Sequence, residues 1–153
     1  KDQDDSEDKE LSFNGVYKVD TGGNITVITD KLTRPNGLAF SPDEKTLYVA
    51  NSDPANAIWM AYKFDEDGGI TESVFFDATS MVPDKSGLPD GLRVDGNGII
   101  YATGPGGVLV FSPEGKHLGT INTGKSTANC ELVRDQKVLY MTAHQQLMRI
   151  KLK

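Results

Sequence analysis

Three segments of the chain repeat one pattern, and this repetition constrains the fold more than any other feature of the sequence. They are RPNGLAFSPDEKTLYVANS (34–52), LPDGLRVDGNGIIYATGP (88–105) and TANCELVRDQKVLYMTAH (127–144). Each segment has an Asn or Asp, then a short strand, a tight polar turn and a second strand centred on a tyrosine. The aligned polar residues are Asn36, Asp90 and Asn129. A unit that recurs about every 40 to 50 residues is typical of the blades of a β-propeller.

The sequence between these repeats supplies the remaining strands. Strand-like runs follow the first repeat (AIWMAYKFD, ITESVFFDA), the second (GVLVFSPEG, HLGTINT) and the third (QLMRIKLK). The stretch NGVYKVDTGGNITVITDKL near the start has the pattern of the last two strands of an earlier unit. The joining turns are rich in Gly, Pro and Asp, and no segment has helical periodicity. We therefore predict an all-β array of four-stranded antiparallel sheets, with two, four, four and three strands in chain order.

Composition argues against a membrane or a nucleic acid as partner. Hydrophobic residues make up 37% of the 153 residues, as in a soluble domain, and no apolar run approaches the roughly 20 residues that cross a bilayer. The formal net charge of −6 repels phosphates. Acidic side chains concentrate in KDQDDSEDKE, so residues 1–12 are predicted to form a solvated loop or tail. The sequence does not distinguish between a cytoplasmic protein and a periplasmic or secreted one.

Propeller geometry gives a role to the polar residue that begins each repeat. The first strand of every blade lines the central channel, and the loops that precede these strands gather at one mouth. Asn36, Asp90 and Asn129 are therefore expected to direct side-chain oxygens toward a common point, although they are far apart in the sequence. Gly37 and Gly91 allow the backbone to turn sharply beside the first two of them.

These segments resemble the family of gluconolactonases, regucalcin (senescence marker protein) and related lactonases, which are six-bladed β-propellers. The resemblance is carried by RPNGLAFSPDEKTLYVANS, by GLPDGLRVDGNGIIYATGPGGVLVFSPEGK and by the ending LYMTAHQQLMRIKLK, and it covers nearly the whole chain. It implies a divalent metal on the propeller axis, usually calcium, with zinc, magnesium and manganese as alternatives. Asn36 matches an asparagine ligand of the family, and Asp90 matches its aspartate ligand, which is also the candidate base or nucleophile.

The resemblance also implies that the chain is only part of a propeller. The family's glutamate ligand and another asparagine ligand belong to earlier blades, and nothing in this sequence corresponds to them. The predicted strands are little more than half of those in a closed ring of six four-stranded blades. Residues 1–153 are therefore expected to be the C-terminal part, about three blades, of one lactonase-type domain. The N-terminal half of that propeller is its expected partner, and the fragment alone is expected to be inactive.

Simpler explanations exist for several of these residues. Pro-Asn-Gly and Pro-Asp-Gly are common turn sequences that need no ligand, although the shared register of Asn36 and Asp90 favours metal binding. Asn129 is explained as well by a structural turn as by a position in the pocket lining. His144 ends a strand, where it either reaches the pocket or forms a structural hydrogen bond.

The apolar residues of the predicted strands have structural roles. Trp59, Phe75 and Phe76 alternate with smaller or polar residues, which predicts a place in the core between blades. Cys130 begins a strand and is predicted to be a buried apolar residue rather than a nucleophile.

The favoured hypothesis is a metal-dependent hydrolase that opens a sugar lactone such as gluconolactone. The cation would polarise the ring carbonyl, and the ionised Asp90 would orient or deprotonate the attacking water. A nucleophilic Asp90, or a phosphotriester or other ester as substrate, stays open. The alternative from another class is a β-propeller that binds a ligand or protein without catalysis, because a fold does not determine a function.

Overall fold

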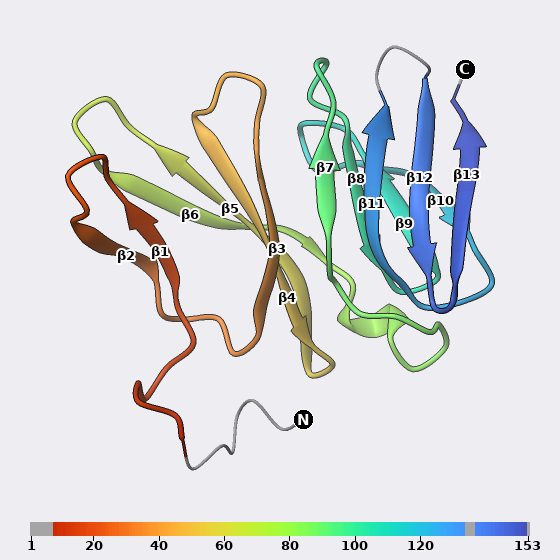
Figure 1. Ribbon diagram of the computed structural model, residues 1–153, viewed down its shortest axis with the longest axis horizontal. Helices are drawn as coiled ribbons and strands as arrows, with labels where there is room; N and C mark the ends of the chain where they lie inside the picture. The colour runs from red at the N-terminus through yellow and green to blue at the C-terminus, as the bar shows by residue number, and fades with distance from the viewer. Residues whose placement is uncertain (1–7, 134–136, 153) are drawn as a thin grey trace.

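The computed structural model describes residues 8–133 and 137–152, and most of these residues form antiparallel strands (Figure 1). The first sheet consists of β1 (Val16–Val19) and β2 (Ile25–Thr29). The second consists of β3 (Pro35–Phe40), β4 (Thr46–Asp53), β5 (Asn56–Phe64) and β6 (Ile70–Asp77). The third consists of β7 (Leu92–Val94), β8 (Ile100–Gly104), β9 (Gly107–Phe111) and β10 (His117–Asn122). The fourth consists of β11 (Thr127–Val133), β12 (Val138–Ala143) and β13 (Gln146–Lys151).

Each strand pairs with its neighbours in chain order, so every sheet is built from consecutive hairpins. The predicted all-β array of two, four, four and three strands is confirmed for the described residues. The sequence pattern did not predict one short 3₁₀ turn, η1 (Thr79–Met81). No helix within the described part of the chain is long and apolar enough to cross a membrane.

Polar turns join the strands as their residues require. In the SPDEK turn between β3 and β4, the Asp43 carboxylate accepts a hydrogen bond from the Ser41 hydroxyl (2.6 Å) and one from the Lys45 amide (3.2 Å). These contacts give the reversing backbone the partners that the sheet no longer supplies. Of the predicted acidic segment 1–12, residues 8–12 contain no strand or helix, and residues 1–7 lie outside the described residues.

The hydrophobic core lies between neighbouring sheets rather than within any one sheet. Between the second and third sheets, Trp59 is 1% exposed, and its ring centroid lies 5.6 Å from that of Phe111. The rings of Phe75 and Phe76 lie 5.6 Å and 4.8 Å from the same Phe111 ring. The predicted core position of Trp59, Phe75 and Phe76 is therefore confirmed. Cys130 is buried in the core between the third and fourth sheets, also as predicted.

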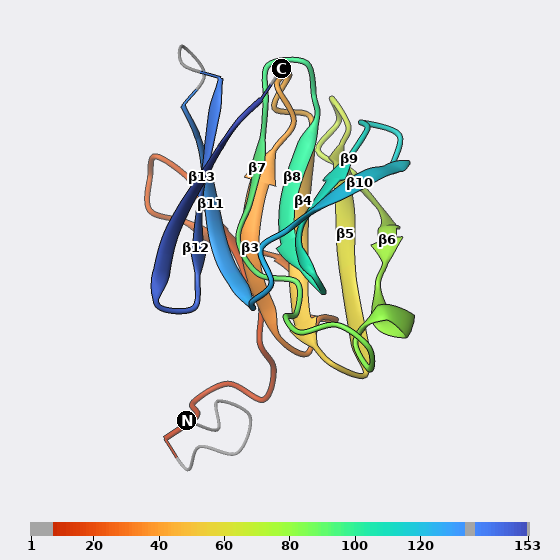
Figure 2. The same cartoon turned by 90° about the vertical axis from the view of Figure 1, so that its right-hand side faces the viewer.

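The strands β3, β7 and β11 form the inner edges of three successive sheets, and β7 contacts both β3 and β11 (Figure 2). Each inner strand starts at the end of the sheet where its partner strand finishes, because Pro35 pairs with Asn51 and Thr127 pairs with Ala143. We call this end, where β3, β7 and β11 start, the mouth of the array; it lies on the lower side of Figure 1. The mouth is where the candidate ligand residues are expected.

The outermost sheets expose apolar side chains at both ends of the array. In the first sheet, Val19 is 63% exposed and Ile25 is 69% exposed. In the last strand, β13, Leu147 is 72% exposed. Single exposed apolar residues are ordinary, but a group of them on a terminal sheet is typical of a surface that packs against another surface.

Candidate functional site

The starts of β3 and β7 approach so closely that no side chain fits between them. A Cβ atom added at Gly37 would lie 2.2 Å from the carbonyl oxygen of Asp90 and 2.8 Å from the Cα atom of Gly91. Both of these atoms belong to the backbone, so they cannot swing aside. The close approach of two sheets therefore requires glycine at position 37, and it brings the segments of Asn36 and Asp90 together at the mouth.

Asn129 also lies at the mouth, but its register differs from the one predicted. In the second, third and fourth sheets, one residue of the inner strand pairs with the residue that follows the central tyrosine of the neighbouring strand. These residues are Leu38 in β3, Leu92 in β7 and Cys130 in β11. Asn129 therefore stands one place later than Asn36 and Asp90, and Ala128 occupies the position equivalent to theirs. The hairpin of β7 and β8 is one residue shorter than the others, so spacing from the tyrosine does not determine the register.

The side chain of Asn129 lies over the backbone of Gly91. A Cβ atom added at Gly91 would be 2.2 Å from Asn129 Oδ1, which itself accepts a hydrogen bond from the Cys130 amide (2.9 Å). The Gly91 amide donates to the Ala128 carbonyl (2.9 Å). These contacts hold the Asp90 segment against the start of β11. A role for Asn129 in lining the pocket stays a prediction.

A buried asparagine anchors the loop that leads to Asn36. Asn51, near the end of β4, is 0% exposed. Its Oδ1 accepts a hydrogen bond from the Arg34 amide (2.7 Å), and its Nδ2 donates to the Thr33 hydroxyl (3.2 Å) and the Asn56 carbonyl (2.9 Å). Because a buried amide without partners costs free energy, these bonds favour one loop conformation. The sequence pattern did not identify Asn51; its signal is a polar residue at the end of the apolar run TLYVAN.

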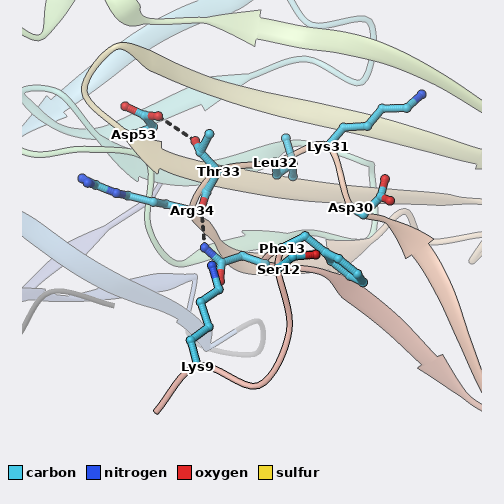
Figure 3. A pocket seen from close by; sticks show the side chains of 10 residues that line it. Lys9, Ser12, Phe13, Asp30, Lys31, Leu32, Thr33, Arg34 and Asp53 are labelled. Carbon is cyan, nitrogen blue, oxygen red and sulfur yellow. Dashed lines mark hydrogen bonds between the residues drawn. The ribbon is translucent and has the colours of Figure 1, made fainter. Parts of the chain in front are cut away.

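The loop before β3 also forms one wall of a hollow in the surface (Figure 3). The hollow has a volume of about 390 Å³, and its lining includes Lys31, Arg34 and Asp53. The Thr33 hydroxyl donates to the Asp53 carboxylate (2.6 Å), and the Asn14 side-chain amide donates to the Thr33 carbonyl (2.6 Å). Two further hydrogen bonds thus hold the loop that leads to Asn36.

Asp90 is half-buried, and this burial raises the pKa of its carboxyl group above the ordinary value. The nearby backbone of Gly91 has a smaller effect on this pKa, in the opposite direction. Among residues 8–133 and 137–152, no lysine, arginine or histidine forms an ion pair with Asp90. A partly desolvated carboxylate without a cationic partner is suited to receiving a cation.

The donor set at the mouth consists of side-chain oxygens. Nowhere in the described part of the chain do three His, Cys, Asp or Glu side chains gather as a metal centre would need. Asn36 and Asp90 offer one amide oxygen and one carboxylate, which are the hard donors that calcium prefers. Calcium takes about 6 to 8 oxygen ligands, so these two residues fit such an ion but cannot complete its shell.

In the metal-free protein, the ionised Asp90 is expected to destabilise the fold at neutral pH. The carboxyl pKa is higher in the folded state than in the unfolded chain. Its contribution to stability is therefore fully present below about pH 4 and is lost as the pH rises through the folded pKa. We expect Asp90→Asn to melt at a higher temperature than the wild type in chelator at about pH 7, with a smaller difference near pH 4.

Thermal unfolding followed by circular dichroism measures this difference. The acidic groups whose pKa is lowered in the fold, such as Asp53 and Asp77, are the same in both proteins, so their effects cancel. Calcium that binds to the Asp90 carboxylate would raise the melting temperature of the wild type more than that of the variant, which lacks the charge. If Asp90→Asn melted at a lower temperature than the wild type in chelator, burial of the Asp90 carboxylate would not destabilise the fold as we expect.

His144 lies in the turn between β12 and β13, at the mouth end of the fourth sheet. Its φ of 53° places it in the left-handed region, and its amide donates to the Ser126 carbonyl (3.0 Å). The side chain is exposed. These contacts give His144 a structural role in the turn, and its predicted place in the pocket lining stays a prediction.

The chain has relatives among proteins named as lactonases. The sequence profile of the family described as SMP-30/Gluconolactonase/LRE-like region matches residues 1–145. A gluconolactonase of Zymomonas mobilis is 37% identical over 155 aligned residues, which cover 98% of this chain and 44% of that protein. A pentonolactonase of Haloferax volcanii is 30% identical over 131 residues, which cover 83% of this chain and 44% of that protein. The chain thus spans less than half the length of these relatives.

Solved structures share the same arrangement of blades. A gluconolactonase of Xanthomonas campestris superposes with a TM-score of 0.81 at 34% identity, over 95% of this chain and 47% of that one. Regucalcin of Agrobacterium tumefaciens, described as a calcium-binding protein, superposes with a TM-score of 0.66 at 25% identity, over 86% of this chain and 46% of that one. The predicted fold class is therefore confirmed, and it is shared with proteins about twice as long.

Proposed function

The chain belongs to the SMP-30/gluconolactonase/LRE-like family, and on this basis we propose that it forms part of a hydrolase that opens sugar lactones. The observation that carries the proposal is the meeting of the Asn36 and Asp90 segments, from two different sheets, at the mouth. The relatives named as gluconolactonase and pentonolactonase indicate the substrate class, a cyclic ester of a sugar acid.

The proposed cofactor is a divalent cation, with calcium as the first candidate, held by Asn36 Oδ1 and the Asp90 carboxylate. Its support is the hard-oxygen donor set, the half-buried carboxylate and the similarity to a calcium-binding regucalcin. When bound, such a cation supplies electrophilic activation of the lactone carbonyl. Asn36 is neutral and Asp90 brings one negative charge, so further ligands must come from water or from residues outside this chain.

Asp90 has a second proposed role as general base. Its carboxylate orients a water molecule and accepts a proton from it while the water oxygen bonds to the lactone carbonyl carbon. The ring C–O bond then breaks, the leaving ring oxygen takes up the proton held by Asp90, and the product is an open hydroxy acid with the carboxylate of Asp90 regenerated. In the metal-free chain, partial burial raises the pKa of the Asp90 carboxyl group and so makes its carboxylate a stronger base, whereas a bound cation would lower that pKa. Asn36 cannot accept a proton at neutral pH, so it contributes orientation alone.

The active unit in this proposal is a ring larger than the chain. The chain aligns with 44% of the Zymomonas protein and 47% of the Xanthomonas structure. The exposed apolar residues of the first sheet and of β13 are suited to packing against the remaining blades. Those blades would also bring the missing ligands, so the isolated chain is expected to be inactive.

The complete protein is expected to hydrolyse D-glucono-δ-lactone, to lose that activity in chelator and to regain it with calcium. Proton release into a weakly buffered indicator solution measures the rate, with the spontaneous hydrolysis subtracted. A phosphotriester offered in parallel tests the other ester chemistry. A folded, complete protein that binds calcium but accelerates no lactone hydrolysis would overturn the proposal in favour of a non-catalytic binding module.

A further inference from the structure

The hydroxyl group of Ser52 lies between the two candidate ligand segments. Ser52 is partly buried near the end of β4. The side-chain amide of Asn36 donates a hydrogen bond to Ser52 Oγ (3.1 Å), and Ser52 Oγ donates in turn to the carbonyl oxygen of Pro89. Pro89 directly precedes Asp90, so one side chain connects the Asn36 strand with the Asp90 segment.

The direction of these two hydrogen bonds determines how the Asn36 amide is turned. A carbonyl oxygen only accepts hydrogen bonds, so Ser52 must use its single hydroxyl proton on Pro89. Ser52 Oγ can then only accept a bond from Asn36, which must therefore present its Nδ2 group rather than its Oδ1. The amide oxygen and nitrogen point in different directions from the same carbon. Asn36 Oδ1, the atom that can bind a cation, is consequently turned away from Ser52.

The same hydroxyl group also secures the backbone before Asp90. Pro89 is among the fully buried residues, and its carbonyl would lose its side-chain partner if Ser52 were removed. The following amides are held from other strands: Asp90 donates to the Thr103 carbonyl (3.0 Å), and Gly91 donates to the Ala128 carbonyl (2.9 Å). The segment of Pro89 to Gly91 is thus held by hydrogen bonds from three sheets, and Ser52 provides the one from the second sheet.

We propose that Ser52 is a positioning residue, which turns Asn36 Oδ1 toward the cation and sets the separation between Asn36 and Asp90. This inference rests on the proposed function, in which those two residues hold the metal. Ser52 is not itself a nucleophile, because its proton is committed to Pro89. In the part of the chain that the structure describes, no histidine or carboxylate bonds to Ser52 Oγ.

Ser52→Ala is expected to weaken calcium binding by about 10- to 100-fold in the complete protein without substrate. The freed Asn36 amide rotates, and the Asp90 segment loses one of its anchors. Ser52→Thr keeps a hydroxyl at the same place and should restore most of the affinity. Titration calorimetry with calcium measures the affinity, and kcat and KM for D-glucono-δ-lactone are measured beside it. The loss of activity is expected mainly in kcat when calcium is subsaturating, and an excess of calcium should restore part of that activity.

Ser41→Ala is the matched control, because Ser41 has a similar role at the other end of the same hairpin. The Ser41 hydroxyl donates to the Asp43 carboxylate (2.6 Å) and accepts a bond from the Thr46 amide (2.9 Å). Its removal should lower the melting temperature as Ser52→Ala does, and leave the calcium affinity unchanged. A merely structural role for Ser52 predicts the same result for both variants.

Asn36→Ala separates failure of this inference from failure of the metal site. If Asn36→Ala weakens calcium binding and Ser52→Ala does not, the positioning role is wrong and the metal site stands. If neither variant changes the affinity, both the positioning role and the proposed ligand set are wrong. Near-ultraviolet circular dichroism confirms that each variant is folded before its affinity is compared.

Discussion

Asp90→Asn is expected to lower kcat for lactone hydrolysis in the complete protein by more than about a hundredfold while the fold survives. The replacement keeps the shape of the side chain and an oxygen that can face a cation. It removes the negative charge and, with it, the proton acceptor of the proposed mechanism. Initial rates at saturating lactone and saturating calcium separate this loss from a simple loss of metal.

Asp84→Asn provides the matched control for this variant. Asp84 is an exposed residue in the same connection between β6 and β7, and the substitution makes the same change of charge. It should leave both kcat and calcium affinity unchanged. Equal turnover by the wild type and Asp90→Asn at saturating calcium would remove Asp90 from the chemistry and leave it, at most, as a ligand.

Gly37→Ala is expected to have the second largest effect, because its methyl group has no space. The added carbon would lie 2.2 Å from the Asp90 carbonyl oxygen, so one of the two inner strands must move. Overpacking of this kind costs about 1 to 3 kcal/mol of stability. A displacement of about 1 Å at a catalytic group costs up to about a hundredfold in rate, so we expect at least a tenfold loss of kcat. Chemical denaturation and lactone kinetics measure the two effects.

Gly96→Ala is the control for the substitution itself. A Cβ atom added at Gly96 meets nothing within 4 Å, and this glycine does not have a positive φ. Stability should change by less than about 1 kcal/mol, and kcat should not change. If Gly37→Ala were as harmless as Gly96→Ala, the two inner strands would have to be further apart than the structure shows.

The strands and their pairing were predictable because most of the hairpins have a local signal in their turn and strand residues. The SPDEK turn has Asp43 to hold the reversal, and the run TLYVA before Asn51 has the residues that favour a strand. The inter-blade place of Trp59 followed from the same alternation. These features depend on residues close in sequence, and the recurrence of the unit extended them to the whole array.

Of the candidate site, the sequence could indicate only those residues whose type and spacing carried a signal. Asn36 and Asp90 stand out because each is followed by glycine before an apolar strand. The register of Asn129 was not predictable, because a difference of one residue between hairpins shifts it without changing the pattern. Asn51 and Ser52 act through residues distant in the sequence: Asn51 accepts a bond from the Arg34 amide in the loop before β3, and the bond from Ser52 to Pro89 exists only after the second and third sheets have packed.

The candidate ligands belong to different sheets, and this division has a consequence for the life of the protein in a cell. Asn36 belongs to the second sheet, and Asp90 directly precedes the first strand of the third. The distance between them therefore depends on how the two sheets pack against each other and not on the folding of either sheet alone. A nascent or damaged chain can contain every hairpin and still lack the proposed cation site. On the proposed function, lactone hydrolysis would therefore begin only after the second and third sheets have docked.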